Sequence, residues 1–156
     1  FSSTAAVYGS VGLEPVLEDA PKAPLSPYGT SKLMTEWMLR DISAASSLQF
    51  GDFRYFNVAG ADPLGRSGHM SGQATHLIKV ACKAALGQLD HIAVFGTDFD
   101  TFDGTGVRDY IHVSDLADAH ALLLDHLRQG GENSESKSAA VIRCSPRNTQ
   151  SVTIAR

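Results

Sequence analysis

The sequence contains few of the residues that cross-link a chain, bind a metal or enter a membrane. Its two cysteines, Cys82 and Cys144, form no C-x-x-C pair, so we expect no disulfide framework and a reducing, cytoplasmic location. Its six histidines lack metal-ligand spacing, so we expect no metal. No apolar run approaches the length of a membrane span. A net charge of -4 gives no general attraction to nucleic acid or to an anionic membrane.

The sequence also lacks an initiator methionine and the basic segment that opens a signal peptide. It begins with an apolar, strand-like run, and no G-x-x-G-x-x-G motif occurs in it. We therefore expect an internal fragment that starts in the middle of a domain. With 43% hydrophobic and 19% charged residues, the chain still has the composition of a globular domain with a core.

Strand-like and helix-like patterns alternate along the chain, which predicts an α/β domain with parallel strands. Turn residues and periodicity define the expected elements. They are the end of a strand at 1–8, a helix at 27–45 that Ser26 caps, a strand ending near Phe56, a helix at 73–87, short strands at 91–96 and 107–113, and a helix that Ser114 caps and Gly130 stops.

Residues 134–156 differ from the preceding sequence, because they are polar, rich in serine and without a sustained helical or strand period. We treat 1–133 as a partial domain and 134–156 as an atypical tail. We expect that tail to be either disordered or the product of a shifted reading frame.

Tyr28 and Lys32, in the stretch "SPYGTSK", are the first candidates for chemistry. At i and i+4 of a helix their Cβ atoms lie about 5–6 Å apart on one face. A neighbouring ammonium stabilises a phenolate, which suits a tyrosine to general acid and base work. Thr4, at an expected strand end, could add a hydroxyl that bridges Tyr28 and a substrate. On the spacing alone, an ordinary surface pair is the preferred interpretation.

Further candidates follow other expected strand ends and a glycine-rich turn. Arg108 follows a flexible Gly-Thr-Gly, where a guanidinium could bind a diphosphate through two hydrogen bonds; a surface pair with Asp109 is the alternative. Phe95 could stack on a base or pack in a core. The strand end "RYFNVAG" carries Tyr55, Phe56 and Asn57.

Four blocks together resemble the extended short-chain dehydrogenase/reductase family, and within it the UDP-glucose 4-epimerases. They are "FSSTAAVYG", "SPYGTSKLMTE", "RYFNVAGADP" and "DGTGVRDYIHVSDLADAH", in the family's order from Phe1 to about Asn133. The resemblance implies a partial Rossmann-like, doubly wound parallel sheet with part of a smaller substrate-binding region. It also implies NAD as cofactor and, in galactose metabolism, the interconversion of UDP-galactose and UDP-glucose by oxidation and re-reduction at the sugar C4.

The resemblance implies a role for each candidate. Tyr28 is implied as the acid and base for the sugar 4-hydroxyl, Lys32 as the residue that holds the nicotinamide ribose, and Thr4 as a partner of the 4-hydroxyl. The implied cofactor-binding residues are Thr4, Tyr28, Lys32, Tyr55 and Phe56. The implied substrate-binding residues are Thr4, Ala5, Ala6, Asn57, Thr75, His76, Leu77, Ala93, Phe95 and Arg108, with Arg108 on the diphosphate and Ala93 and Phe95 at the uracil.

Several alternatives stay open beside this interpretation. Sugar-nucleotide 4,6-dehydratases carry an acidic pair where this chain has Ala5 and Ala6, so elimination would lack its proton donor. Epimerases of UDP-uronates or UDP-N-acetylhexosamines, or a non-catalytic dehydrogenase-like binding module, remain possible readings of the sequence. We expect the isolated fragment to be inactive.

The helix at 27–45 is apolar over more than half of its circumference, so it should bury two faces. In the resembling family this helix lies in a dimer interface, which implies a homodimer of the full-length protein. Burial against other parts of the same chain is the alternative. The apolar positions are Leu33, Met34, Trp37, Met38, Leu39 and Ile42.

Overall fold

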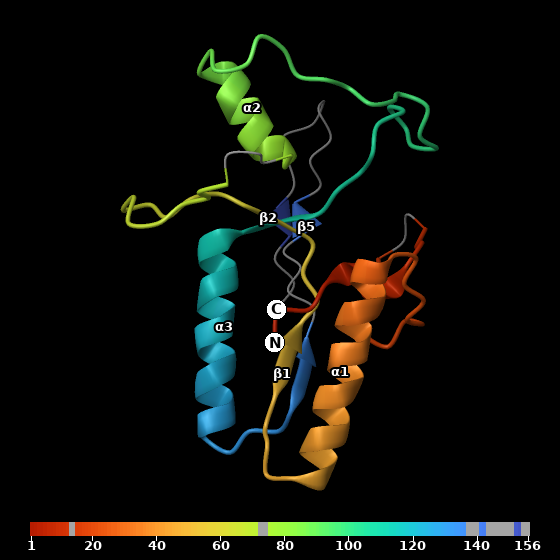
Figure 1. Cartoon of the computed structure of the whole chain (residues 1–156), viewed down its shortest axis with the longest axis vertical. Helices are drawn as coiled ribbons and strands as arrows, with labels where there is room; N and C mark the ends of the chain where they lie inside the picture. The colour runs from red at the N-terminus through yellow and green to blue at the C-terminus, as the bar shows by residue number, and fades with distance from the viewer. Residues whose placement is uncertain (13–14, 72–74, 137–140, 143–151, 154–156) are drawn as a thin grey trace.

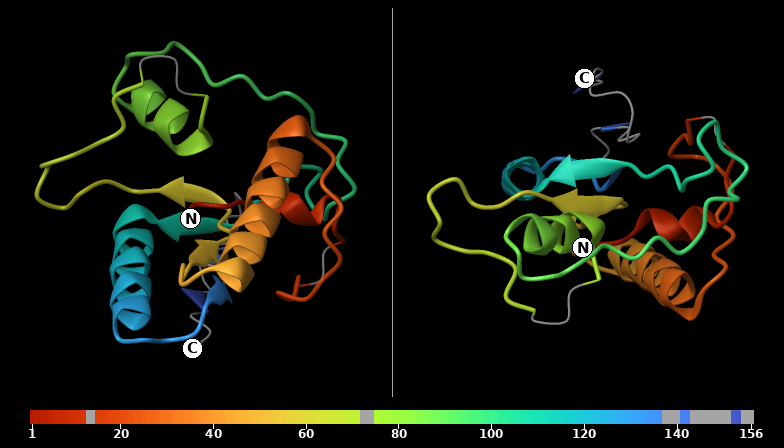
Figure 2. Two further views of the ribbon diagram at one scale, coloured as in Figure 1. Left: turned by 60° about the horizontal axis from the view of Figure 1, so that its bottom comes forward. Right: turned by 90° about the horizontal axis from the view of Figure 1, so that it is seen from above.

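The computed structural model describes residues 1–12, 15–71, 75–136, 141–142 and 152–153. Its helices are η1 (Ala5–Tyr8, a 3-10 turn), α1 (Pro27–Ala45), α2 (Leu77–Ala85) and α3 (Val113–Arg128). Its strands are β1 (Gly51–Phe53), β2 (Asn57–Ala59), β3 (Tyr110–His112), β4 (Ser134–Ser136), β5 (Val141–Ile142) and β6 (Val152–Thr153). The long helices α1 and α3 lie on opposite sides of the strands, as two views of the molecule show (Figures 1 and 2).

Strand pairing follows the predicted parallel pattern. Strand β1 pairs in parallel with β4, and β2 pairs in parallel with β3. Ser2 adds a parallel bridge to Phe53 on β1. Helices on both sides of parallel strands confirm the predicted α/β class. The short pair β5–β6 is antiparallel.

Helix α1 has the predicted bounds and the predicted cap. The hydroxyl of Ser26 accepts the backbone N–H of Gly29 at 3.1 Å, and Pro27 occupies the first turn, where a missing N–H costs nothing. Gly29 is buried because this turn lies directly against η1: a Cβ on Gly29 would sit 2.8 Å from the carbonyl oxygen of Ala6. The first turn of α1 is therefore fixed beside η1.

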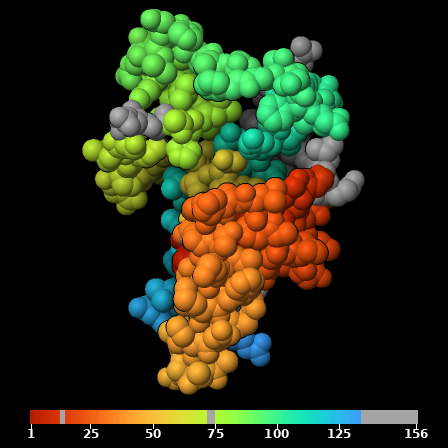
Figure 3. Space-filling model, turned by 45° about the vertical axis from the view of Figure 1, so that its right-hand side comes forward, coloured from red at the N-terminus to blue at the C-terminus, as the bar shows by residue number. Residues whose placement is uncertain are grey.

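The predicted second buried face of α1 is exposed in the single chain. Leu33 packs with Val7 and Tyr8 in the core beneath the helix. Met34, Trp37 and Met38 are about half exposed, and α1 covers much of the molecular face seen in Figure 3. The pattern predicted the apolar character of this face correctly, but within the described residues no element covers it.

Two strand predictions were wrong. The strand expected at 1–8 is reduced to the bridge at Ser2, because the Thr4 hydroxyl accepts the N–H of Ala6 at 3.2 Å and starts η1. Residues 91–96 form no strand; they run as exposed coil with no neighbouring strand among the described residues to supply backbone partners. A β-type sequence becomes a strand only when a ladder is available.

Several boundaries also moved. The strand expected to end near Phe56 divides into β1 and β2, since the two halves pair with different strands. Helix α2 begins at Leu77 rather than at residue 73. Helix α3 begins one residue before its predicted cap Ser114, because His112 Nδ1 accepts the Ser114 N–H at 3.2 Å and caps the helix instead. Gly130, with φ of 81°, ends α3 as predicted.

The tail expected at 134–156 lies largely outside the described residues. Its first residues form β4, although their sequence has no strand period, because backbone bonds to β1 define this strand. The domain division at residue 133 stays a prediction.

Within the described residues, no helix is long and apolar enough to cross a bilayer. The same residues contain no group of three or more histidine, cysteine, aspartate or glutamate side chains that could hold a metal ion.

Candidate active site

Tyr28 and Lys32 lie together on the first two turns of α1. The Lys32 ammonium is 5.8 Å from the centroid of the Tyr28 ring and 5.0 Å from that of Phe1, and it donates to the carbonyl of Ser2 at 2.9 Å. Tyr28 is 57% exposed, so its side chain is accessible to a ligand. A cation fixed on the same helix face as an exposed tyrosine is compatible with proton transfer by that tyrosine.

Thr4 lies between the bridge at Ser2 and the turn η1. Its side chain is buried, and its hydroxyl accepts the Ala6 N–H. Ala5 and Ala6 are in η1, and the Ala5 N–H donates to the carbonyl of Tyr55 at 3.1 Å. The close approach of Gly29 to Ala6 brings η1 against the turn of α1 that carries Tyr28. Tyr55 and Phe56, both half-buried, lie in the break between β1 and β2.

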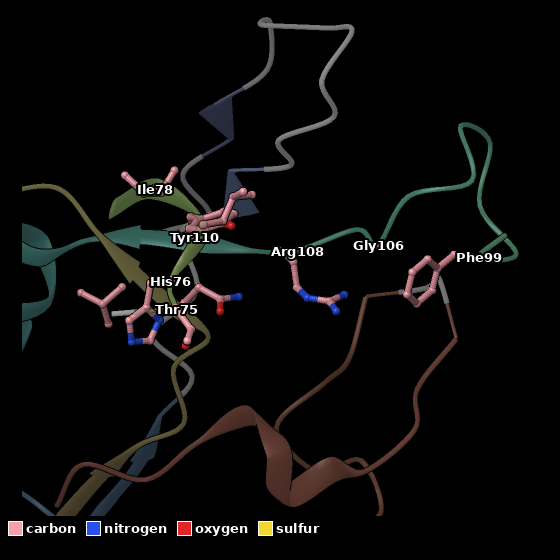
Figure 4. A pocket seen from close by; sticks show the side chains of 10 residues that line it. Thr75, His76, Ile78, Phe99, Gly106, Arg108 and Tyr110 are labelled. Carbon is pink, nitrogen blue, oxygen red and sulfur yellow. The ribbon is translucent and has the colours of Figure 1, made fainter. Parts of the chain in front are cut away.

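A second group of candidates lines a cavity of about 320 Å³. Its walls come from β2, from the start of α2, from β3 and from the coil before β3, as the close view shows (Figure 4). The cavity brings together five predicted residues from three separate segments of the sequence: Asn57, Thr75, His76, Leu77 and Arg108. Its volume is in the range of small-molecule sites.

Asn57 and Arg108 come from neighbouring parallel segments. The Asn57 side-chain amide and its backbone N–H both donate to the carbonyl of Asp109, at 3.1 and 3.2 Å, which fixes the start of β2 beside the residue that follows Arg108. Arg108 Nη1 donates to the carbonyl of Val107 at 2.8 Å. Among the described residues Arg108 has no carboxylate partner, so the surface pair with Asp109 does not form.

The cavity also shows what the sequence did not reveal. Phe99, which lines the same cavity as Arg108 (Figure 4), comes from a loop with no periodic pattern, so no sequence signal identified it. Ile78 follows Leu77 and Tyr110 lies two residues after Arg108, but in the sequence both looked like ordinary helix and strand positions. The remaining additions to the lining are Val58 and Gly106.

Ala93 and Phe95 do not line this cavity. Both lie in the exposed coil at 91–96, and the Phe95 side chain is 96% exposed. The strand expected to position them is absent, so their contact with a uracil stays a prediction.

Charges flank the loop that leads from β2 to α2. Lys79 donates to the carbonyls of His69 and Ser71, both at 2.7 Å, and its positive charge lowers the pKa of His69. A hydrogen bond from Arg66 lowers the pKa of Asp62 to about 2. Both ends of this loop are therefore tied by charged side chains.

Known proteins resemble the chain along most of its length. Residues 1–136 match the NAD dependent epimerase/dehydratase family. A UDP-glucose 4-epimerase of Azospirillum brasilense is 66% identical over 131 residues, which are 84% of this chain and 38% of that protein. The chain thus spans well under half the length of this curated relative.

Solved structures of UDP-glucose 4-epimerases also resemble this chain. The UDP-glucose 4-epimerase from Brucella ovis in complex with NAD aligns with a TM-score of 0.84 at 44% identity, over 90% of this chain and 43% of that one. The UDP-glucose 4-epimerase from Bifidobacterium longum in complex with NAD+ and UDP aligns with a TM-score of 0.81 at 42% identity, over 90% and 42%. These alignments confirm the predicted partial Rossmann-like fold.

Proposed function

Because the chain belongs to the NAD dependent epimerase/dehydratase family, we propose that it carries the acid–base pair and part of the substrate site of a UDP-glucose 4-epimerase, an NAD-dependent isomerase that interconverts UDP-galactose and UDP-glucose. One observation carries this proposal: the Lys32 ammonium is held at the Ser2 carbonyl, 5.8 Å from the ring of an exposed Tyr28. A surface pair without function would need no such anchor on its lysine.

The residues present fit the ribose half of NAD. A lysine ammonium and a phenol on one helix face are suitable partners for the two hydroxyls of a nicotinamide ribose. Tyr55, whose carbonyl accepts the Ala5 N–H, and Phe56 add aromatic side chains in the break between β1 and β2. The glycine-rich motif that would bind the cofactor diphosphate does not occur in this sequence. When bound, NAD supplies a hydride acceptor and donor for the sugar C4.

In the proposed reaction, Tyr28 accepts the proton of the sugar 4-hydroxyl and later returns it. The Lys32 ammonium stabilises the Tyr28 phenolate that accepts this proton, and the Thr4 hydroxyl orients the 4-hydroxyl. Arg108 binds the diphosphate through charge-assisted hydrogen bonds. Asn57, Thr75, His76 and Leu77 enclose the sugar nucleotide beside it.

Further proposals concern the biological setting. We propose a cytoplasmic protein of galactose metabolism that forms a homodimer through the exposed apolar face of α1, which carries Met34, Trp37 and Met38. We retain residues 1–133 as the epimerase portion and 134–156 as an atypical tail.

A chimera tests the activity. This chain replaces the matching segment of the Azospirillum brasilense UDP-glucose 4-epimerase, and conversion of UDP-galactose to UDP-glucose is measured. We expect turnover in the chimera and none in the 156-residue chain alone, which has no glycine-rich cofactor motif. A folded chimera that binds NAD but leaves UDP-galactose unchanged would contradict the proposal. Conversion of a UDP-uronate or UDP-N-acetylhexosamine instead would favour the alternative substrates.

Arg108→Ala in the chimera tests whether this arginine binds the diphosphate of the substrate. Since hydrogen bonds to a charged group contribute about 1.5–3 kcal/mol, we expect KM for UDP-galactose to rise about 10- to 100-fold. Arg128→Ala, which removes an exposed arginine from the end of α3, is the control and should leave KM unchanged. An unchanged KM in Arg108→Ala would exclude Arg108 from diphosphate binding.

A further inference from the structure

A buried ionic cluster lies beneath the Tyr28–Lys32 pair. The carboxylate of Glu36 and the guanidinium of Arg54 are almost completely buried and meet through Nε and Nη2 of Arg54, at distances of 2.8 to 3.2 Å. Asp52 is a second buried carboxylate, with one oxygen 3.6 Å from Nη2 of Arg54. Glu36 comes from α1, whereas Asp52 and Arg54 come from β1 and the residue after it. The cluster therefore ties the catalytic helix to the sheet.

The same ion pair holds the chain on both sides of Thr4. Before Thr4, the buried hydroxyl of Ser3 donates to Oε1 of Glu36. After Thr4, the phenol of Tyr8, at the end of η1, accepts Nη1 of Arg54 at 3.0 Å. Tyr8 is buried, and this burial raises its pKa, so it stays a neutral phenol. One buried pair thus fixes the segment that presents the Thr4 hydroxyl.

Helix α1 makes a matched second contact with that segment. Lys32 and Glu36 are at i and i+4, so they lie on one helix face, and Tyr28 lies one turn before Lys32 on the same face. Lys32 donates to the backbone carbonyl of Ser2 at 2.9 Å, and the Glu36 carboxylate accepts the hydroxyl of Ser3. Two successive turns of the helix therefore bind two successive residues, Ser2 and Ser3, that precede Thr4. A shift of α1 along the segment would break both contacts together.

We propose that Ser3 and Glu36 are positioning residues that, together with Arg54, hold the Thr4 hydroxyl in register with Tyr28 and Lys32. This inference rests on the function proposed for those three residues. A buried ion pair adds little net stability compared with apolar side chains of similar size, so fixing one register explains its presence better than stabilising the core does. Positioning errors of about 1 Å are enough to cost about 100-fold in turnover.

Ser3→Ala in the chimera is the test. The substitution removes the hydrogen bond from Ser3 to Glu36 but leaves the Glu36–Arg54 pair intact, so the variant should fold. We expect kcat to fall by about tenfold while KM for UDP-galactose changes by less than about twofold, the pattern of an interaction that acts on the reacting centre. Ser3→Thr retains the hydroxyl and should recover most of the lost kcat.

Leu116→Ala is the matched control for stability. Leu116 is a buried residue on α3, so its truncation weakens the fold through a helix that carries none of Tyr28, Lys32 and Glu36. We expect Leu116→Ala to lower the unfolding temperature at least as much as Ser3→Ala, yet to keep the parent kcat below that temperature. A parental kcat in Ser3→Ala, or equal losses of kcat in both variants, would overturn the positioning role. An inactive parent chimera, or a Tyr28→Phe variant that retains activity, would instead reject the proposed function on which this inference rests.

Discussion

Tyr28→Phe in the chimera is expected to reduce kcat for UDP-galactose by about 10²- to 10⁴-fold, the usual contribution of a positioned general acid or base. The substitution removes only the phenolic oxygen, and it leaves the ring beside the Lys32 ammonium. Because Arg108 and Asn57 line a cavity to which Tyr28 does not contribute, KM should stay close to its parental value. Initial rates of UDP-glucose formation over a range of UDP-galactose concentrations give both constants.

The control for Tyr28→Phe is Thr30→Val. Thr30 lies two residues further along α1 and is exposed, so its substitution removes a hydroxyl from the same helix without affecting the proposed chemistry. We expect parental rates in this control. If Tyr28→Phe retained more than a tenth of the parental kcat, Tyr28 would not be the acid and base, and the reaction would need another proton carrier.

Arg54→Met is expected to destabilise the chain by about 3–5 kcal/mol, the typical effect of removing one partner from a buried ion pair. The substitution leaves the carboxylates of Glu36 and Asp52 buried near each other without the guanidinium that now neutralises them, and it removes a donor to Tyr8. Since small proteins are stable by only about 5–15 kcal/mol, this loss is a large part of the total. Urea unfolding of the 156-residue chain, followed by circular dichroism, measures it.

Two further variants make the Arg54 result interpretable. Arg66→Met removes an arginine that is 72% exposed from its pair with Asp62 and should change the unfolding midpoint much less than Arg54→Met does, because this guanidinium lies in solvent. Adding Glu36→Leu to Arg54→Met replaces the pair by apolar side chains and should recover part of the lost stability. If Arg54→Met and Arg66→Met had the same unfolding midpoint, Arg54 would not be needed to neutralise the buried carboxylates of Glu36 and Asp52.

The two proposed site groups differed in how much of them could be read from the sequence. The Tyr28–Lys32 spacing needed only a helix of the right bounds, and Ser26 and Pro27 specify that helix locally. The grouping of Asn57, the pair Thr75 and His76, and Arg108 in one cavity rested on the resemblance, because many residues separate these three segments. Phe99 and the cluster around Arg54 gave no sequence signal, since a lone aromatic or a lone arginine is compatible with many environments.

By itself, the sequence determined the α/β class, the start and end of α1, the glycine that stops α3 and the candidate catalytic and binding residues. These features depend on contacts between residues that are close in the chain: side-chain caps, turn glycines and helical periodicity. Only the tertiary structure decided that residues 5–8 form a turn, that residues 91–96 form no strand, and that Glu36 and Arg54 are buried together. Strand ladders and buried ion pairs need partners from distant segments, and local sequence does not specify which partners arrive.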